Sequence, residues 1–345
     1  MKIRKLNALR GIAALIVVVS HYSNAVGLWG GLLGEGSGQF GVMLFFILSG
    51  FLMSYLYLDK EFNKENVKYF AIARFARVIP LFVIIVLLSY FLHLAKINGI
   101  FYAITTPKIL FSHLFLLSGV SVLWTIPPEV QFYVLFAFLW WLYSRRKGYL
   151  FVLMATIFCG LVFVHFPDLQ WKFHGVDIQA RLVRSLPYFF IGVVFGQVYQ
   201  RWQAPEYLRK NIFVLALALV PLLFPNIFHF LMGYTHTTWS DAGIFLVVSA
   251  IFFVLIFFVP DDNPILASPV GDFLGTVSYS LYLLHLPLLN LITNISKQSP
   301  LLFLFVFVAL ALAVAYVSYR LLEAPSRRGL RALLIGKDKP PAGEA

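Results

Sequence analysis

The sequence predicts an all-α integral membrane protein with about ten transmembrane helices and both termini in the cytoplasm. Hydrophobic residues make up 60% of the 345 residues and charged residues only 12%, whereas a soluble domain is about half apolar and about a quarter charged. So few charges cannot make the surface of such a chain wettable, but a bilayer accepts an apolar surface. The 36 Phe, 17 Tyr and 7 Trp and the mean hydropathy of +0.84 agree, because aromatic rings fill helix interfaces and headgroup belts.

The transmembrane helices are located by apolar runs of about 20 residues, the length that crosses the hydrocarbon core as a helix. We expect helices at 9–27, 39–58, 78–95, 123–143, 149–166, 184–200, 211–232, 242–259, 273–294 and 300–322. The first run also has features of a secretory signal peptide, because basic residues precede a short apolar core and small residues follow it. Cleavage there would leave an odd number of spans, so we interpret this run as a retained helix.

The positive charges set the orientation of the chain. The formal net charge is +12, which is compatible with nucleic-acid binding, but the cations fall between the apolar runs. With the N-terminus inside, the inner segments hold 19 Lys and Arg and the outer segments five, as the positive-inside rule requires. We therefore expect cytoplasmic termini and no nucleic-acid partner. The inner loop that contains Asp261 and Asp262 is acidic and departs from this trend.

A single transmembrane domain is expected over residues 1–330, because no connection between the predicted spans is long enough to fold alone. Residues 331–345 should form a disordered cytoplasmic tail. The longest outer connection is 96–122, and its apolar piece 109–117 is too short to span, so it should be interfacial or re-entrant. The single cysteine, Cys159, excludes an internal disulfide and a multi-thiolate metal site, and we expect no metal.

Two ionisable residues of the first predicted helix are functional candidates, because charged groups at membrane depth are costly unless they face a cavity or a partner. Arg10 and His21 are eleven residues apart, which returns them to nearly the same helical face with a rise of about 16 Å. We expect Arg10 at the cytoplasmic boundary and His21 deep in the membrane or in its outer half. Arg10 alone has an alternative role as a snorkelling anchor, and His21 as a packed, hydrogen-bonded side chain. As a pair they favour a functional role.

A second candidate, Glu129, follows two prolines. Pro127 and Pro128 are unfavourable inside a helix but tolerated in its first turn, so we predict a helix that begins here. Glu129 then lies in the first turn, where the helix dipole favours a carboxylate. A charged helix start inside the bilayer usually lines a cavity. In the alternative, the helix begins at the outer interface and Glu129 lies in water, and the sequence leaves both open.

A pair of arginines lies at the predicted inner boundary. Arg74 and Arg77 are three residues apart and share a helical face. Guanidinium groups bind phosphate oxygens bidentately, so this pair is a candidate site for the phosphates of a nucleotide-like donor. Anionic lipid headgroups would bind to the same groups.

Two further segments combine small, aromatic and polar residues. Phe45 to Phe51 includes Ser49 and Gly50, where two helices can approach closely, so we expect a packing role. In the ninth predicted helix, Tyr282 and His285 share a face. They are either a second polar patch of the same cavity or an aromatic cluster at the membrane interface.

Six motifs occur in a fixed order along nearly the whole chain. They are Leu9-Arg10-Gly11 through Ser20-His21, Phe45-Phe46 with Ser49-Gly50, Arg74 with Arg77 and Pro80, Leu123-Trp124 with Glu129 and Gln131-Phe132-Tyr133, Tyr279-Ser280-Leu281-Tyr282-Leu283-Leu284-His285 with Pro287, and Glu323 with Pro325. Together they resemble the bacterial acyltransferase-3 family of integral-membrane O-acyltransferases. The resemblance implies a ten-helix domain of the bacterial inner membrane that moves acetyl, or a related short acyl group, from cytoplasmic acyl-CoA to a glycan hydroxyl.

The resemblance also assigns residues. It implies that Arg10 and His21 are essential and that the characteristic glutamate of the family is Glu129. The family commonly has two acidic residues at this point, whereas the stretch 125–130 has one, which argues against any role that needs a carboxylate pair. Some members carry an appended periplasmic hydrolase-like domain, and this chain, which stops at Ala345, resembles the stand-alone members.

We therefore expect His21 to act as a general base on the acceptor hydroxyl, with Glu129 orienting His21 or that hydroxyl. Arg10, Arg74 and Arg77 would hold the phosphates of acyl-CoA, which is a substrate; no cofactor is expected to be permanently bound. The expected partners are a glycan or lipid-linked saccharide and membrane lipids. An acyl-histidine intermediate is the alternative mechanism. The alternative function is a transporter of an acyl group or polysaccharide, since buried charges and broken helices also mark transport sites, although no inverted repeat is detectable.

Overall fold

The fold is described by a computed structural model for residues 3–97, 99–150, 152, 155, 160, 170–173, 176–179, 181–296 and 299–335. These residues divide into two compact units. The first unit contains residues 3–55 and 187–315, and the second contains the described residues of 56–186 and 316–335. Each unit is described by itself.

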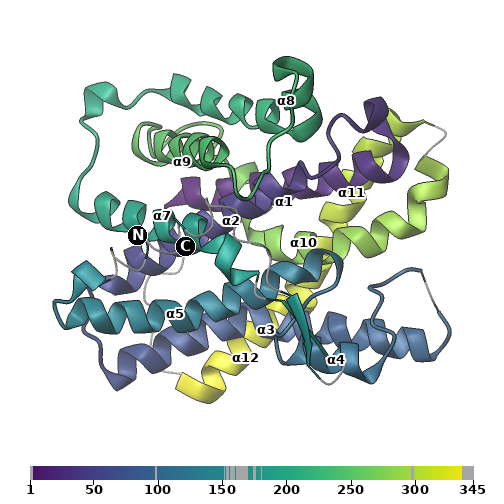
Figure 1. Cartoon of the computed structure of the whole chain (residues 1–345), viewed down its shortest axis with the longest axis horizontal. Helices are drawn as coiled ribbons and strands as arrows, with labels where there is room; N and C mark the ends of the chain where they lie inside the picture. Colours follow the sequence, from purple (N-terminus) through teal and green to yellow (C-terminus); the bar gives the residue numbers. More distant parts are fainter. Residues whose placement is uncertain are drawn as a thin grey trace. The chain divides into compact units, whose positions relative to one another are not determined.

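The first unit is helical. Its elements are α1 (Arg4–Val26), a short 3-10 helix (Leu28–Gly31), α2 (Gly38–Met53), most of α7 (Leu182–Arg201), 3-10 segments at Glu206–Leu208, Asn211–Leu219 and Pro221–Leu223, α8 (Pro225–Met232), α9 (Ala242–Phe257), α10 (Pro269–Ser296) and nearly all of α11 (Pro300–Ser318). Helix α1 packs along both α10 and α2 (Figure 1). The core between the helices is aromatic and aliphatic; for example, Phe46 stacks on Phe189 with ring centroids 4.5 Å apart.

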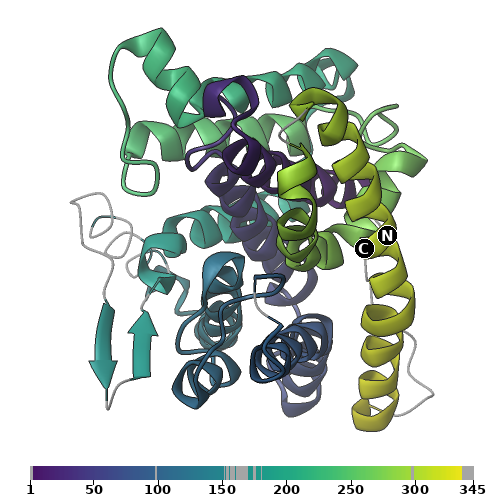
Figure 2. The same cartoon turned by 90° about the vertical axis from the view of Figure 1, so that its right-hand side faces the viewer.

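The second unit contains longer helices and one short sheet. Its elements are a π-helical turn (Ser54–Leu58), α3 (Lys64–Leu94), α4 (Pro107–Leu114), a 3-10 helix (Ser121–Thr125), α5 (Ile126–Ser144), β1 (Gln170–Phe173), β2 (Val176–Gln179), a second π-helical turn (Tyr319–Glu323) and α12 (Ala324–Ile335). Helix α3 packs against α5 and α12. The strands pair antiparallel, with Gln170 opposite Gln179, and Figure 2 shows them as paired arrows. This hairpin is an addition to the all-α fold that the sequence predicts.

The described residues contain seven helices that are long and apolar enough to cross a membrane, or eight if one sharply bent pair counts as a span. The chain is therefore a multi-pass membrane protein, but the predicted number of ten is not reached in this part of it. Five of the seven match predicted spans closely, whereas Lys64–Leu94 and Pro300–Leu334 extend well beyond their predicted ranges. The predicted span 149–166 lies largely outside the described residues. The predicted span 242–259 corresponds to α9, which has 16 residues.

The predicted continuous span 211–232 is wrong, because the chain bends by 85° between Asn211–Leu223 and Pro225–Met232. The reason is local. Phe224, which precedes Pro225, adopts an extended conformation with φ −61° and ψ 134°, since a proline ring disfavours helical geometry in the residue before it. The result is a broken span or a re-entrant segment rather than one straight helix.

Two helix starts bear on the candidate residues. Helix α5 begins at Ile126 with Pro127 and Pro128 in its first turn, which confirms the predicted start. Helix α3 begins earlier than predicted, at Lys64, where the Asn63 side chain accepts a hydrogen bond from the Asn66 backbone N–H at 2.9 Å. Residues 64–77, expected as part of an inner loop, are therefore helical. At about 1.5 Å per residue, α3 is longer than the hydrocarbon core is thick.

Small residues let the helices of the first unit approach closely. A side chain at Gly50 of α2 would meet the backbone of Phe189 in α7, and one at Gly192 of α7 would meet the backbone of Ile47. These contacts confirm the packing role predicted for the segment that contains Gly50.

Two shorter helices of the second unit, α4 and α12, bear on the predicted outer connection and the predicted tail. Helix α4 has eight residues, so the apolar piece of the outer connection forms a helix too short to span. At the other end, α12 extends to Ile335. The predicted tail therefore includes the last turn of α12, and its remaining residues, 336–345, lie outside the described part of the chain.

Candidate functional site

A pair of histidines lies between α1 and α10 of the first unit. His21 comes from α1 and is half-buried, whereas His285 comes from α10 and is fully buried. The two rings are 5.1 Å apart between centroids, and His285 Nε2 lies 3.1 Å from His21 Nδ1. Two residues separated by 264 positions thus share one hydrogen bond, in a part of the chain where polar groups are scarce.

The other partners of the two rings fix where the protons lie. His285 Nδ1 faces the carbonyl oxygens of Tyr282 at 2.8 Å and Leu281 at 3.2 Å. A carbonyl only accepts, so His285 Nδ1 carries the proton and, in the neutral ring, Nε2 is an acceptor. His21 Nδ1 also faces a carbonyl, that of Val17, at 3.0 Å. It therefore donates both to this carbonyl and to His285 Nε2, and the Nε2 atom of His21 keeps the lone pair.

Close packing of α1 on α10 brings the histidines together. A side chain at Gly11 would meet Leu274, and one at Gly275 would meet the backbone of Asn7, so both glycines are required where the helices touch. Near the start of α1, Asn7 Nδ2 donates to the carbonyl of Asp272 at 2.9 Å. These contacts hold the two helices in register from their first turns onward.

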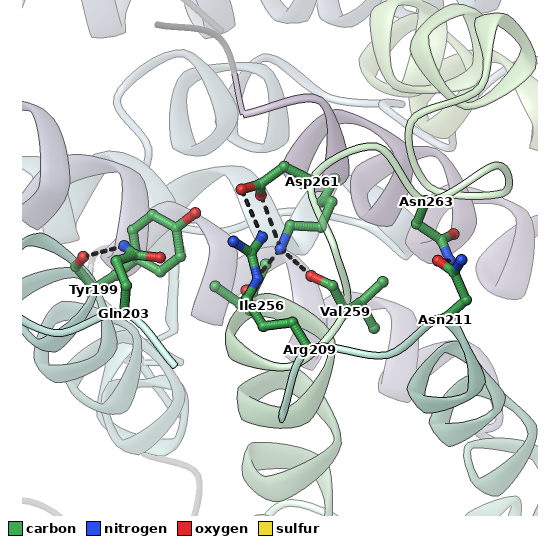
Figure 3. Close-up of polar contacts among 9 residues, drawn as sticks. Tyr199, Gln203, Arg209, Asn211, Ile256, Val259, Asp261 and Asn263 are labelled. Carbon is green, nitrogen blue, oxygen red and sulfur yellow. Dashed lines mark hydrogen bonds and ion pairs between the residues drawn. The ribbon is translucent and has the colours of Figure 1, made fainter. Parts of the chain in front are cut away.

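The start of α1 is anchored by a buried lysine. Lys5 is 0% exposed, and its Nζ donates to the carbonyls of Ile256 at 2.8 Å and Val259 at 2.6 Å and lies 3.0 Å from Asp261 Oδ1. The carbonyls lie at the C-terminal end of α9, where a cation is favourable. Arg209 Nη2 pairs with Asp261 Oδ2 at 2.6 Å, and Figure 3 shows this pair beside the two carbonyl groups.

The charges around Asp261 explain an acidic loop that did not fit the positive-inside pattern. Burial raises the pKa of Asp261, but the hydrogen bond from Arg209 and the charge of Lys5 outweigh burial and hold the pKa below its ordinary value. Asp261 is therefore an internal counterion for two of the basic residues of the predicted inner face.

Arg10 lies in α1, half-buried, and the helix is unbroken from Arg10 to His21. The predicted arrangement of the two residues on one helix is therefore present. The role of Arg10 in binding a donor stays a prediction.

Glu129 lies in the second unit, in the first turn of α5 as predicted, and is half-buried. Its Oε1 accepts a hydrogen bond of 2.6 Å from the hydroxyl of Tyr133, one turn further along. Tyr133 is buried and lies within range of the charges of Arg74 and Arg77. The structure thus places Glu129 in the same polar region as the two arginines of α3.

The two arginines of α3 differ in exposure. Arg74 is buried, at 7% exposed, and its guanidinium lies 5.4 Å from the centre of the Tyr57 ring, within the range of a cation–π interaction. Arg77 is half-buried on the next turn. Both therefore belong to the interior of the second unit rather than to a freely solvated loop.

Three features of these sites were not predicted. His285 was recognised as part of a polar patch, but its partner lies on a helix 264 residues away. Tyr133 belongs to a quoted motif, but its hydrogen bond to Glu129 follows only from the helix that both share. Arg331 is the first residue of the predicted disordered tail and Arg327 lies just before it, yet both are half-buried. The signal in the sequence for two of these features was the four-residue spacing of Glu129 and Tyr133 and of Arg327 and Arg331, which places each pair on one helical face.

Within the part of the chain that the structure describes, no group of three or more His, Cys, Asp and Glu side chains could hold a metal ion. A closed structural zinc site needs four such ligands.

Comparison with known proteins gives consistent matches. The sequence profile of a family described as "Acyltransferase domain" matches residues 3–320. The chain is 27% identical over 364 residues to a Staphylococcus aureus (strain COL) protein named "Putative O-acetyltransferase". It is 24% identical over 358 residues to the O-acetyltransferase OatA of Staphylococcus aureus (strain NCTC 8325 / PS 47).

The two alignments cover nearly all of this chain but a much smaller share of each relative. They include 95% and 94% of this chain but only 58% and 57% of the two relatives. The chain therefore spans rather more than half the length of these relatives. No solved structure matches the chain.

Proposed function

Because the chain belongs to the acyltransferase-3 family, we propose that it is a bacterial inner-membrane O-acyltransferase. It moves an acetyl or related short acyl group from cytoplasmic acyl-CoA to a hydroxyl of a cell-surface or exported glycan. The observation that carries this proposal is the hydrogen bond between His21 Nδ1 and His285 Nε2 at 3.1 Å, which leaves a lone pair on Nε2 of a histidine in a candidate membrane span.

His21 Nε2 is the proposed general base. It takes the proton of the acceptor hydroxyl as the hydroxyl oxygen attacks the carbonyl carbon of the thioester. The C–S bond then breaks, and the CoA sulfur leaves with the proton that His21 returns. The products are an O-acyl ester and free CoA thiol, and His21 ends in the protonation state in which it began.

His285 is a positioning residue in this mechanism. Its Nδ1–H is held by two backbone carbonyls, so its Nε2 is always presented to His21 as an acceptor. This contact favours the His21 tautomer that carries its proton on Nδ1, and thereby keeps the Nε2 lone pair for the reaction. A group that fixes the tautomer of a catalytic histidine works without touching substrate.

The proposed donor groups are Arg10, Arg74 and Arg77. Guanidinium groups suit the phosphates of CoA because each can make two parallel hydrogen bonds to phosphate oxygens. Glu129, which accepts from Tyr133, is proposed to position groups around the reacting atoms rather than to act as one of two paired acids.

The proposal is tested by measuring acetate released by mild alkali from envelope glycans of cells that produce the protein, lack it, or produce His21→Ala. The expected result is ester-linked acetate only with the unaltered protein, with His21→Ala equal to the deletion while the variant is present in the membrane at the same level. Equal ester content in all three strains would contradict the proposed function.

The sidedness of the reaction is tested in proteoliposomes of defined orientation. Acyl-CoA supplied at the arginine face should acylate an acceptor present only at the other face, because the positive-inside rule assigns the arginines to the cytoplasm. Ester formation only when donor and acceptor share one face would retain the enzyme and overturn transfer across the membrane. Passage of intact glycan or acyl-CoA without ester formation would instead identify a transporter.

A further inference from the structure

The C-terminal helix of the second unit carries two arginines toward the arginine pair of α3. Helix α12 packs along α3, and Arg327 and Arg331 lie four residues apart on one face of α12. Arg327 lies within range of electrostatic repulsion by Arg77, and Arg331 lies within range of repulsion by Arg74 and Arg327. Four guanidinium groups from two helices that are about 250 positions apart in the sequence are therefore gathered in one region.

The surroundings of these four groups are partly dry. Arg74 is buried, and its Nε has no hydrogen-bond partner among the residues that the structure describes. Arg77, Arg327 and Arg331 are half-buried. A buried guanidinium donor without an acceptor is costly, and native proteins rarely keep one unless a ligand or water satisfies it.

The four guanidinium groups carry like charges, and two carboxylates act in the same region. Glu323, which is 5% exposed, acts on Arg327, and Glu129 lies beside Tyr133, on which Arg74 and Arg77 also act. Like charges repel strongly where water is excluded, so guanidinium groups gathered in this way favour an anionic ligand beside them.

We propose that Arg74, Arg77, Arg327 and Arg331 form one site for a ligand with several phosphate groups, and that α12 supplies half of it. If the proposed function holds, this ligand is the phosphorylated adenosine part of the CoA donor. Phosphate oxygens match the site because guanidinium groups bind them bidentately and stay charged when half-buried. The headgroup of an anionic phospholipid carries the same chemistry and is the other possible source of the phosphate.

The site makes the C-terminal helix part of the donor-binding machinery. Arg331 was the first residue of the predicted disordered tail, but the proposed site requires α12 to be folded and packed on α3. Removal of α12 should therefore remove donor binding without altering the histidine pair of the first unit, because the hydrogen bonds of that pair among the described residues lie within α1 and α10.

The test compares the full-length protein in neutral detergent with a double variant, Arg327→Gln with Arg331→Gln. The matched control is Arg328→Gln, an exposed position on the same helix. Calorimetric titration with CoA should show affinity reduced by about tenfold to a hundredfold in the double variant, because charge-assisted bonds to phosphate are lost. The control should stay within about twofold of the unaltered protein. Unchanged CoA affinity in a folded double variant, judged by its melting temperature, would overturn CoA as the ligand.

A second titration distinguishes the two sources of phosphate. Vesicles of phosphatidylcholine with and without phosphatidylglycerol are mixed with the same proteins. If the double variant loses binding to phosphatidylglycerol but not to CoA, the phosphate site stands and its ligand is a lipid. If neither affinity changes, the site itself is wrong.

The same experiments separate this inference from the proposed function. Unaltered protein that binds CoA but forms no ester would contradict the enzyme and leave the arginine site standing. If the unaltered protein forms ester and the double variant has an unchanged KM for acetyl-CoA, the proposed enzymatic function stands. Arg327 and Arg331 are then not part of the donor site. The variant Arg327→Lys with Arg331→Lys should retain part of the affinity, because lysine keeps the charge but not the bidentate geometry.

Discussion

The two compact units carry different kinds of polar group. The first unit holds a pair of hydrogen-bonded histidines, His21 and His285, at the interface of α1 and α10. The second holds Arg74, Arg77 and a Tyr133–Glu129 hydrogen bond, with two more arginines on α12. Neutral imidazoles with one open lone pair suit proton transfer, whereas clustered guanidinium groups suit the binding of anions. Under the proposed function, changes in the histidine pair should therefore alter the rate of the chemical step, and changes in the arginines of α3 and α12 should alter the affinity for the donor.

The two basic clusters of the chain sharpen the same contrast. Lys5 and Arg209 share the carboxylate of Asp261, and Lys5 also donates to two carbonyls. Both cations of this cluster pair with one carboxylate, and the cluster fixes the end of α9 to the start of α1. In the arginine cluster of α3 and α12, the Nε of the buried Arg74 has no hydrogen-bond partner among the described residues. Basic residues at the predicted inner face thus include an internally paired, structural cluster and a proposed ligand-binding cluster.

The largest effect is expected for His21→Ala. The variant should lose about 10²- to 10⁴-fold in kcat for acyl transfer, because a methyl group cannot accept the proton of the acceptor hydroxyl. Its affinity for CoA, measured by titration, should equal that of the unaltered protein, since the phosphate site lies in the other unit. A loss of CoA affinity with unchanged kcat would reverse the assignment of roles to the two units.

The next largest effect is expected for Arg74→Ala and Arg77→Ala. Each should raise the KM for acetyl-CoA and weaken CoA binding by about tenfold or more, while kcat at saturating donor changes little, because phosphate contacts mainly provide uniform binding. Arg145→Ala, in the exposed segment after α5, is the control and should leave both constants unchanged. Equal CoA affinity in all three variants would move the phosphate site elsewhere, and Arg10 would be the next residue to test.

A smaller effect is expected for His285, the proposed positioning residue for His21. His285→Ala should lower kcat by about tenfold, because His21 then loses the acceptor that favours its reactive tautomer. His285→Asn should recover part of the rate, since its amide can donate to the carbonyls and its oxygen can accept from His21. The pH–rate profile should shift in the alanine variant, and this shift separates positioning from a loss of fold. Wild-type rates and profile in His285→Ala would exclude the positioning role.

The smallest effect concerns stability and the Asp261 cluster. The pKa of Asp261 is lower in the folded protein than its ordinary value. Asp261 therefore contributes stability that is fully present above the unfolded pKa of about 4, and this stability is lost as the pH falls through the folded pKa. Asp261→Asn should lower the melting temperature at pH 7 by a few degrees and flatten its decrease below about pH 4.

The matched control for this variant is Asp262→Asn, at the exposed neighbouring position. It should leave both the melting temperature and its pH dependence unchanged. Identical melting curves for Asp261→Asn and the unaltered protein would show that the cluster does not anchor α1.

Local patterns predicted the parts of the sites that lie on one helix. Arg10 and His21 share α1, and the proline pair before Glu129 marks the start of α5, because turn chemistry and helical period act over a few residues. The break before Pro225 was also local and followed from the restriction on the preceding residue, but the apolar run concealed it. The hydropathy of 211–232 was uniform, and length alone suggested one span.

Pairings between distant helices could not be predicted. His285 was placed on a polar face, but its contact with His21 depends on the close packing of α1 and α10 at Gly11 and Gly275. In the same way, Arg331 has the composition of a solvated tail, and only the packing of α12 on α3 places it beside other arginines. Periodicity gives the face of a helix and not the helix that covers it.

The central claim is that the histidine pair performs the chemistry and the arginines bind the donor. It is tested most directly by measuring acetyl transfer from labelled acetyl-CoA and CoA affinity in the same preparations of unaltered protein, His21→Ala and the Arg74→Ala, Arg77→Ala double variant. The account predicts that His21→Ala binds CoA normally and transfers no acetyl group, whereas the arginine variant transfers at saturating donor but binds CoA weakly. Acetyl transfer by His21→Ala at the rate of the unaltered protein would contradict it.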